Sequence, residues 1–98
     1  MKIIWSPLAI EQARDIAAYI ALDKPSAAEQ WIGEIFSSVE RLEKCSNSGR
    51  IVPEIGRNNI REIVRGNYRI MYKIAVDSVE VLVVKSNRQN LDSNELEG

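Results

Sequence analysis

The side chains with the clearest chemical potential are the cations of one basic stretch, which begins at Gly49 and ends at Tyr72. Six cations lie in this stretch or directly after it: Arg50, Arg57, Arg61, Arg65, Arg69 and Lys73. With only Glu54 and Glu62 to oppose them, the local charge is +4, whereas the whole chain carries −1. This contrast favours an anionic partner. Arginine suits such a partner because its planar guanidinium group binds a carboxylate or a phosphate with two hydrogen bonds at once.

Strand alternation predicts where these cations point. Arg61 and Arg65 fall on one face of a strand, and Arg69 and Lys73 share one face of the next. If the intervening turn pairs the two strands, up to four cations gather on one side of the sheet. We therefore interpret this side as a partner-binding face. Its candidate residues, including one cation just beyond the last strand, are Arg50, Arg57, Arg61, Arg65, Arg69, Lys73 and Arg88.

A plainer alternative stays open for the same residues. The outer side of a surface sheet must be polar in any case, and some arginines can pair with Glu54 and Glu62. Exposed pairs of this kind contribute at most about 1 kcal/mol to stability. On this interpretation the basic face is only a solvated surface.

Several kinds of chemistry are not expected of this chain. It has no histidine and one cysteine, Cys45, so neither a transition-metal site nor an internal disulfide is expected. The phosphate-binding and nucleotide-binding glycine motifs are missing as well, and no cofactor is expected. A stacking platform for bases would need aromatic residues on the basic face, but alternation puts Tyr68 and Tyr72 on the opposite one. Direct nucleic-acid binding is therefore not expected.

The chain is predicted to be a single domain of 98 residues in the cytoplasm. Its first apolar run, MKIIWSP, is far too short for a signal peptide or a membrane span. We therefore expect no association with a membrane.

The first half of the chain predicts a strand and two helices. A short strand is expected at Lys2–Trp5, followed by a helix with Ser6 as N-cap and Pro7 at its first position. A break at Asp23–Ser26 separates it from a second helix, and such a short break implies an antiparallel hairpin. Apolar stripes at helical spacing mark the buried faces, Ala9, Ala13, Ile16, Ala17 and Ile20 in the first helix, and Ala28, Trp31, Ile32, Ile35, Val39 and Leu42 in the second.

The second half predicts strands. Residues 60–64 and 68–74 read as two strands joined by a tight turn at Gly66-Asn67, and residues 79–84 as a central strand covered on both faces. A short extended piece is expected at 51–53, and the tail from about residue 89 is expected to be frayed or weakly helical. The fold class is therefore α+β, with an N-terminal strand and an antiparallel helix hairpin packed on one face of a small antiparallel sheet.

Several motifs together resemble the RelE/ParE toxin superfamily of type II toxin–antitoxin (plasmid-stabilisation) modules. The start of the chain is similar to the ParE branch, with Ser6-Pro7 after a strand and two long helices. The matching motifs are Gly49-Arg50, Val52-Pro53-Glu54, Ile60-Arg61-Glu62, Tyr68-Arg69-Ile70-x-Tyr72 and Arg88. The resemblance implies a toxin that forms a hetero-oligomer with a cognate antitoxin, ParD-like or of another type II class, and that inhibits DNA gyrase when free.

Two alternatives to gyrase inhibition stay open. The resemblance also covers RelE-type nucleases, which cut mRNA on the ribosome, and there Arg69 and Arg88 match phosphate-binding residues. RNA cleavage needs an acid and a base as well, and the segment after Arg88, QNLDSNELEG, holds no Tyr, His, Lys or Arg. The ParE branch, which is not an enzyme, is therefore favoured. The second alternative is a protein-interaction module without toxicity.

Overall fold

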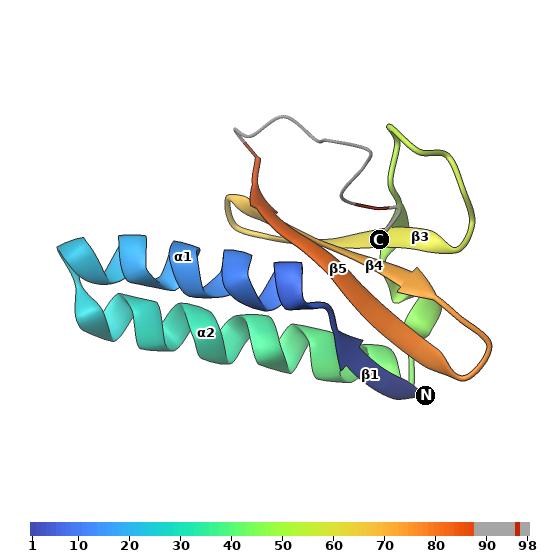
Figure 1. The fold of residues 1–98 in the computed structure, drawn as a ribbon, viewed down its shortest axis with the longest axis horizontal. Coiled ribbons are helices and arrows are strands. Elements are labelled where there is room, and N and C mark those ends of the chain that lie inside the picture. Colours follow the sequence, from blue (N-terminus) through green and yellow to red (C-terminus); the bar gives the residue numbers. More distant parts are fainter. Residues whose placement is uncertain (88–95, 97–98) are drawn as a thin grey trace.

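Five strands and two helices make up the fold in the computed structural model, which describes residues 1–87 and residue 96 (Figure 1). In chain order the elements are β1 (Lys2–Trp5), α1 (Pro7–Asp23), α2 (Pro25–Glu40), the 3₁₀ turns η1 (Arg41–Glu43) and η2 (Ser46–Ser48), β2 (Arg50–Ile51), β3 (Ile60–Arg65), β4 (Tyr68–Ile74) and β5 (Ser78–Ser86). The predicted order of a strand, a helix hairpin and a run of strands is confirmed. The expectation of a frayed or helical tail from about residue 89 falls outside the described residues, apart from residue 96.

The strands form one sheet in the order β1-β5-β4-β3-β2. Strands β2 to β5 are antiparallel neighbours, but β1 pairs with β5 in parallel, with Trp5 opposite Val81. The sheet is therefore mixed rather than wholly antiparallel. The helix hairpin connects β1 to the other strands, so β1 does not form a β-hairpin with β2. It lies instead beside the last strand, β5, and runs in the same direction.

The junction between β1 and α1 is fastened to β5. Ser6 caps α1 by accepting a hydrogen bond from the Ala9 backbone N–H at 3.0 Å, and Pro7 occupies the first turn, as predicted. The Ser6 hydroxyl also donates to the Leu82 carbonyl at 3.1 Å. Leu82 is an extra residue in β5, because Met71 pairs with Val83 while Tyr72 pairs with Val81. The cap thus satisfies a carbonyl at a β-bulge.

The helix hairpin packs on one face of the sheet and makes the main core. Ala9 of α1 and Trp31, Ile35 and Val39 of α2 pack against Ile70, Tyr72, Val79, Val81 and Val84 from the strands. The rest of the predicted α1 stripe packs around this cluster in partly buried positions. Ile32 departs from the expectation of burial, since it is 38% exposed.

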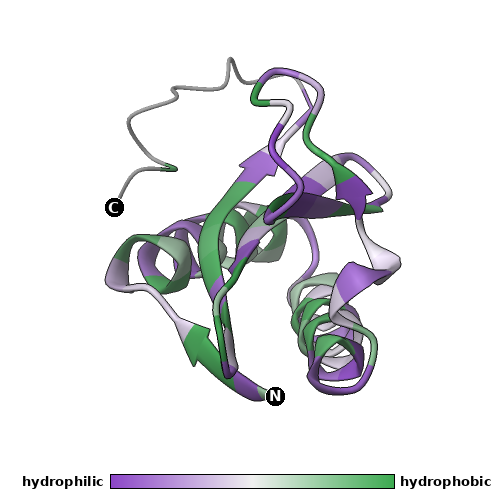
Figure 2. Ribbon diagram, turned by 90° about the vertical axis from the view of Figure 1, so that its right-hand side faces the viewer, coloured by the Kyte–Doolittle hydropathy of each residue, from purple (hydrophilic) through white to green (hydrophobic). Residues whose placement is uncertain are grey.

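The opposite face of the sheet carries a second, smaller core. Val52, Ile60, Met71, Leu82, Val83 and Leu96 are buried together there. Strand β5 contributes to both cores, with Val81 and Val84 in the first and Leu82 and Val83 in the second, so the prediction of a central strand covered on both faces is confirmed. In Figure 2 the apolar colour follows this long strand over most of its length.

Candidate partner-binding surfaces

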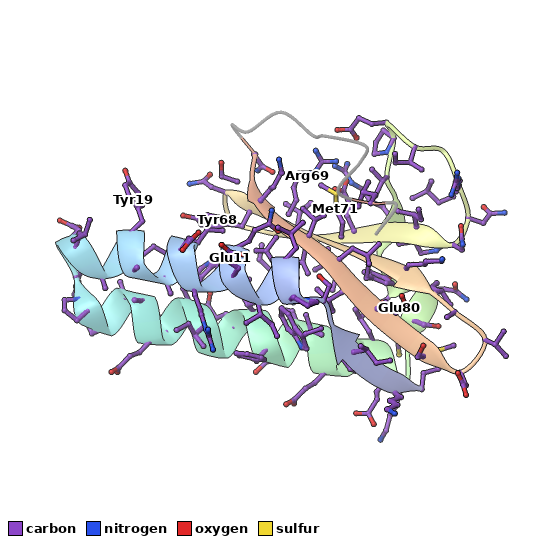
Figure 3. The ribbon with its side chains drawn as sticks, viewed as in Figure 1. Glu11, Tyr19, Tyr68, Arg69, Met71 and Glu80 are labelled. Atoms are coloured by element: carbon purple, nitrogen blue, oxygen red, sulfur yellow. The ribbon has the colours of Figure 1, made fainter. Side chains whose placement is uncertain are left out.

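The predicted four-cation face is wrong, because the register of the hairpin splits the cations between the two faces of the sheet. Gly66 and Asn67 form a two-residue turn with φ +58° at Gly66, so Arg65 lies opposite Tyr68. Arg61 likewise lies opposite Tyr72, whereas Arg69 lies opposite Val64. Directly opposed residues share a face. Arg61 and Arg65 therefore lie on the helix-covered face, and Arg69 lies with Met71 on the other, which is called the open face below (Figure 3).

Arg69 is held by two carboxylates on the open face. Its Nε donates to Glu62 Oε1 at 2.6 Å, and its Nη1 and Nη2 donate to the two oxygens of Glu54 at 2.9 Å each. The second oxygen of Glu62 accepts from Arg50 Nε at 2.5 Å. The Glu62 side chain is 0% exposed and that of Arg69 only 13%. The alternative of pairing with Glu54 and Glu62 is therefore confirmed for Arg50 and Arg69, but at a partly buried site.

The ion pair between Arg69 and Glu54 shifts the pKa values of its two members in opposite directions. The hydrogen bond from Arg69, followed by a backbone hydrogen bond, lowers the pKa of Glu54. The bond to Glu54, helped by Glu62 and opposed by burial, raises the pKa of Arg69. Arg69 thus stays charged, with all three of its nitrogens already engaged. A group in this state is poorly placed to bind a substrate phosphate.

Arg61 and Tyr72 fix the segment that enters β2. The Tyr72 hydroxyl accepts from the Gly49 backbone N–H at 3.0 Å and donates to the Ser46 carbonyl at 2.7 Å. Arg61 donates through Nη1 to the Gly49 carbonyl at 3.0 Å and through Nε to the Asn58 carbonyl at 3.0 Å. A Cβ atom at Gly49 would lie 2.5 Å from the Tyr72 hydroxyl, so only glycine fits this approach. Arg61 therefore serves the local structure.

A basic groove runs between α2 and the outer edge of β3. It has a volume of about 940 Å³, and its cationic side chains are Arg41, Lys44, Arg50 and Arg65. Arg65 Nε donates to Ser38 Oγ of α2 at 2.7 Å, which spans the floor of the groove. A second hollow shares Ser38, Arg41 and Arg65 with the first and continues along α2 past Glu34. Arg41 and Lys44 were not among the predicted candidates, because they lie before the basic stretch that begins at Gly49.

The remaining partner-binding candidates are dispersed. Arg57 is exposed in the loop between β2 and β3, and Lys73 is exposed near the end of β4. Arg88 falls outside the described residues. The structure therefore brings Arg50 and Arg65 together with two unpredicted cations, and it leaves Arg57 and Lys73 apart from them.

An apolar groove lies on the outer side of the helix hairpin. It has a volume of about 440 Å³ and is lined by Trp5, Ile10, Ala13, Arg14, Ala17, Ile32 and Phe36. The rings of Trp5 and Phe36 contact at a centroid distance of 5.1 Å, yet Phe36 remains 47% exposed. Two apolar helix residues of its lining, Ile10 and Phe36, lie outside the predicted stripes. Such exposed apolar surface commonly marks an interaction site.

Residues 1–87 and 96 contain neither a cluster of metal-binding side chains nor a membrane-spanning helix. No group of three or more Cys, Asp or Glu residues in this part of the chain is arranged to hold a metal ion. Among the same residues, no helix has the length and apolar character needed to cross a membrane.

Comparisons with known proteins agree with the fold. The family described as "ParE toxin of type II toxin-antitoxin system, parDE" matches residues 3–91 of the chain. A solved structure described as the chromosomal ParDE TA system from P. aeruginosa superposes with a TM-score of 0.71 and 19% sequence identity, and the match covers 88% of this chain and 95% of that one. No curated protein sequence matches the chain.

Proposed function

Since the family match spans nearly the whole chain, the protein belongs to the ParE toxin family of type II toxin–antitoxin systems, and we propose that it inhibits DNA gyrase when free and is neutralised by a cognate antitoxin. In this proposal the chain works in the cytoplasm as a single toxin domain. It acts by binding, so it is not an enzyme and needs no cofactor.

One observation favours gyrase inhibition over RNA cleavage. A RelE-type nuclease would use Arg69 to bind phosphate. Here the three guanidinium nitrogens of Arg69 donate hydrogen bonds to Glu54 and Glu62 instead. Releasing Arg69 would leave the buried Glu62 carboxylate with one of its two ion pairs, the one to Arg50, which is costly for a buried charge. The network therefore favours a structural role for Arg69 over a catalytic one.

The apolar groove supports neutralisation by a partner. Amphipathic helices dock their apolar face into grooves of this kind, and here Ile10, Ile32 and Phe36 are exposed at its border. We assign this groove to a helix of the antitoxin. Among the predicted partner-binding residues, the exposed Arg50, Arg57, Arg65 and Lys73 remain candidates for secondary contacts.

The decisive experiment expresses the chain with and without the antitoxin encoded beside it. Purified toxin is then assayed for inhibition of DNA supercoiling by gyrase, and separately for mRNA cleavage on ribosomes. We expect growth arrest, loss of supercoiling and intact mRNA, with all effects reversed by the antitoxin.

Each other outcome selects a different function. Ribosome-dependent cuts with normal supercoiling would identify a nuclease. Normal growth with confirmed folded protein would identify an interaction module without toxicity. The variant Arg69→Lys is a useful addition, because it should leave gyrase inhibition intact in any molecules that still fold.

A further inference from the structure

The basic groove between α2 and β3 has a charge opposite to that of the chain as a whole. Its cationic lining residues are Arg41, Lys44, Arg50 and Arg65, and among the described residues that line it only Glu62 is acidic. The lining therefore carries a charge of +3, whereas the whole chain carries −1. Both oxygens of the buried Glu62 already accept from arginines, so this carboxylate does not cancel the attraction of the groove for an anion.

Most of the donors in this groove are unused. Within residues 1–87 and 96, the side chains of Arg41 and Lys44 make no hydrogen bond and no ion pair. Arg65 uses only its Nε, in the bond to Ser38 Oγ. Arg50 likewise uses only its Nε. All four cationic residues are exposed. The groove therefore offers several charged N–H donors to a ligand that arrives from solvent.

The length of the basic part fits a row of phosphates. Its helix side runs from Ser38 to Lys44, a rise of about 9 Å at 1.5 Å per residue. One strand of a DNA duplex presents a phosphate about every 3.4 Å along the helix axis, so about three phosphates lie beside this length. Four cations match that number, and the planar guanidinium groups can bind phosphate oxygens with two hydrogen bonds at once.

The composition of the lining favours a duplex over a single strand. No Trp, Tyr or Phe is among the described residues that line the groove. Proteins that bind single strands stack the unpaired bases on aromatic side chains, whereas a duplex keeps its bases stacked inside and presents its phosphates. The expectation against nucleic-acid binding rested on the lack of such a stacking platform. It therefore applies to unpaired bases and not to the backbone of a duplex.

We propose that the basic groove binds the phosphate backbone of duplex DNA without preference for sequence. Backbone contacts position a protein on DNA and carry no sequence information directly. The proposal deepens the proposed function, and its biological purpose rests on that function. Gyrase acts on DNA, so a toxin bound to the enzyme meets DNA nearby, and even a weak contact then strengthens binding as a second, linked site.

The test measures binding of the purified full chain to short fluorescent DNA duplexes of two unrelated sequences, without gyrase. Fluorescence anisotropy gives the affinity at salt concentrations from about 0.05 M to about 0.2 M. We expect equal affinities for the two sequences. With about three phosphates contacted, the logarithm of the binding constant should fall with the logarithm of the salt concentration with a slope of about −3.

The double variant Arg41→Ala/Lys44→Ala removes two of the cations. Because these side chains make no contact within the described chain, the fold should persist, which circular dichroism checks. We expect about tenfold weaker binding or worse, and a slope of about −1. The matched control is Lys2→Ala/Lys24→Ala, which removes the same charge at exposed positions outside the groove and should leave the slope unchanged.

Four outcomes would overturn the proposal. The first is no binding by the folded chain at the lowest salt concentration, and the second is unchanged binding by the Arg41/Lys44 variant. Tighter binding of a single-stranded DNA or RNA of the same length would assign the groove to unpaired strands. Equal competition by poly-glutamate of the same charge would reduce the site to general attraction of anions.

The result is distinguishable from failure of the proposed function. A chain that binds duplex DNA but leaves supercoiling unaffected would contradict gyrase inhibition alone. A chain that inhibits supercoiling but binds no DNA would contradict the DNA site alone.

Discussion

At the scale of single residues, several cations of the basic stretch are engaged within the chain itself. Arg61 donates hydrogen bonds to backbone carbonyls, and Arg69 donates to carboxylates of its own chain. Arg41 and Lys44, outside the stretch, line a groove. Local charge density therefore identified a region with many ionic contacts, but the number of arginines did not indicate how many are available to a partner.

The buried ion pair leads to a prediction about stability. Arg69→Met removes both bonds to Glu54 and one of the two ion pairs of Glu62, which has no contact with solvent. We expect a loss of about 2–4 kcal/mol in the free energy of unfolding, measured by urea denaturation. Glu54→Gln is the matched control, because it weakens only an exposed pair and should cost less than about 1 kcal/mol.

Equal stability of the Arg69→Met variant and the unaltered chain would contradict the structural role. If such a variant also lost antitoxin binding, Arg69 would instead be a recognition residue.

Glu54 gives the stability a dependence on pH. Because Arg69 lowers its pKa in the folded state, the folded protein binds fewer protons than the unfolded chain near the ordinary value of 4.5. The contribution is therefore fully present above pH 4.5 and is lost as the pH falls through the folded-state pKa. Urea midpoints of the unaltered chain and Glu54→Gln should differ near pH 6 and converge as the pH falls below the folded-state pKa of Glu54. A constant difference across this range would rule out the linkage.

At the scale of elements, most of the fold could be predicted because its signals are local. The cap at Ser6, the apolar stripes of the helices and the turn at Gly66-Asn67 each involve residues close in sequence. The parallel pairing of β1 with β5 could not be predicted, since it depends on contacts between distant segments. The bulge at Leu82 was hidden as well, because a continuous apolar run has no alternation to interrupt.

The face assignment of the arginines failed for a different reason. The two-residue turn was recognised, and such a turn by itself places Arg65 opposite Tyr68. Applying that register would have put Arg65 on the face of Tyr68, away from Arg69. The information was present in the sequence, but the alternation of each strand was considered separately.

The junction of β1, α1 and β5 can be tested through its cap. Ser6→Ala removes the bond to the Ala9 N–H and the bond to the Leu82 carbonyl. We expect a loss of about 1–2 kcal/mol, measured as a lower midpoint of thermal or urea unfolding. Ser26→Ala is a suitable control, since Ser26 lies in the first turn of α2 and supplies no side-chain cap. Equal effects of the two substitutions would show that the junction is not fastened by Ser6.

At the scale of the whole molecule, the two grooves lie on different sides of α2. The apolar groove is lined by Ile32 and Phe36, and the basic groove by Ser38 and Arg41. The hairpin itself extends beyond the sheet (Figure 1) and leaves Leu22 86% exposed near its tip. One helix thus borders a groove on either side, with the sheet core on its remaining face.

The assignment of the apolar groove to the antitoxin is tested by Ile32→Glu. A charge placed there should weaken antitoxin binding by tenfold or more, because a buried apolar contact is replaced by a desolvated carboxylate. The fold should persist, since Ile32 does not belong to the main core. Isothermal titration calorimetry measures the affinity. Tyr19→Glu is the control on α1, where the side chain points away from α2 (Figure 3) and is 74% exposed. Unchanged affinity of the Ile32 variant would place the antitoxin elsewhere.

The pairing of the first strand with the last has a consequence for biosynthesis. Ser6 bonds to Leu82, 76 residues later in the chain. At typical translation rates of about 5–20 residues per second, this separation corresponds to about 4–15 s of synthesis. During that interval β1 has no neighbour, and α1 and α2 have no sheet on which to pack. A newly made chain therefore cannot complete its sheet until β5 is synthesised, and any partner that recognises the folded surface can bind only after that moment.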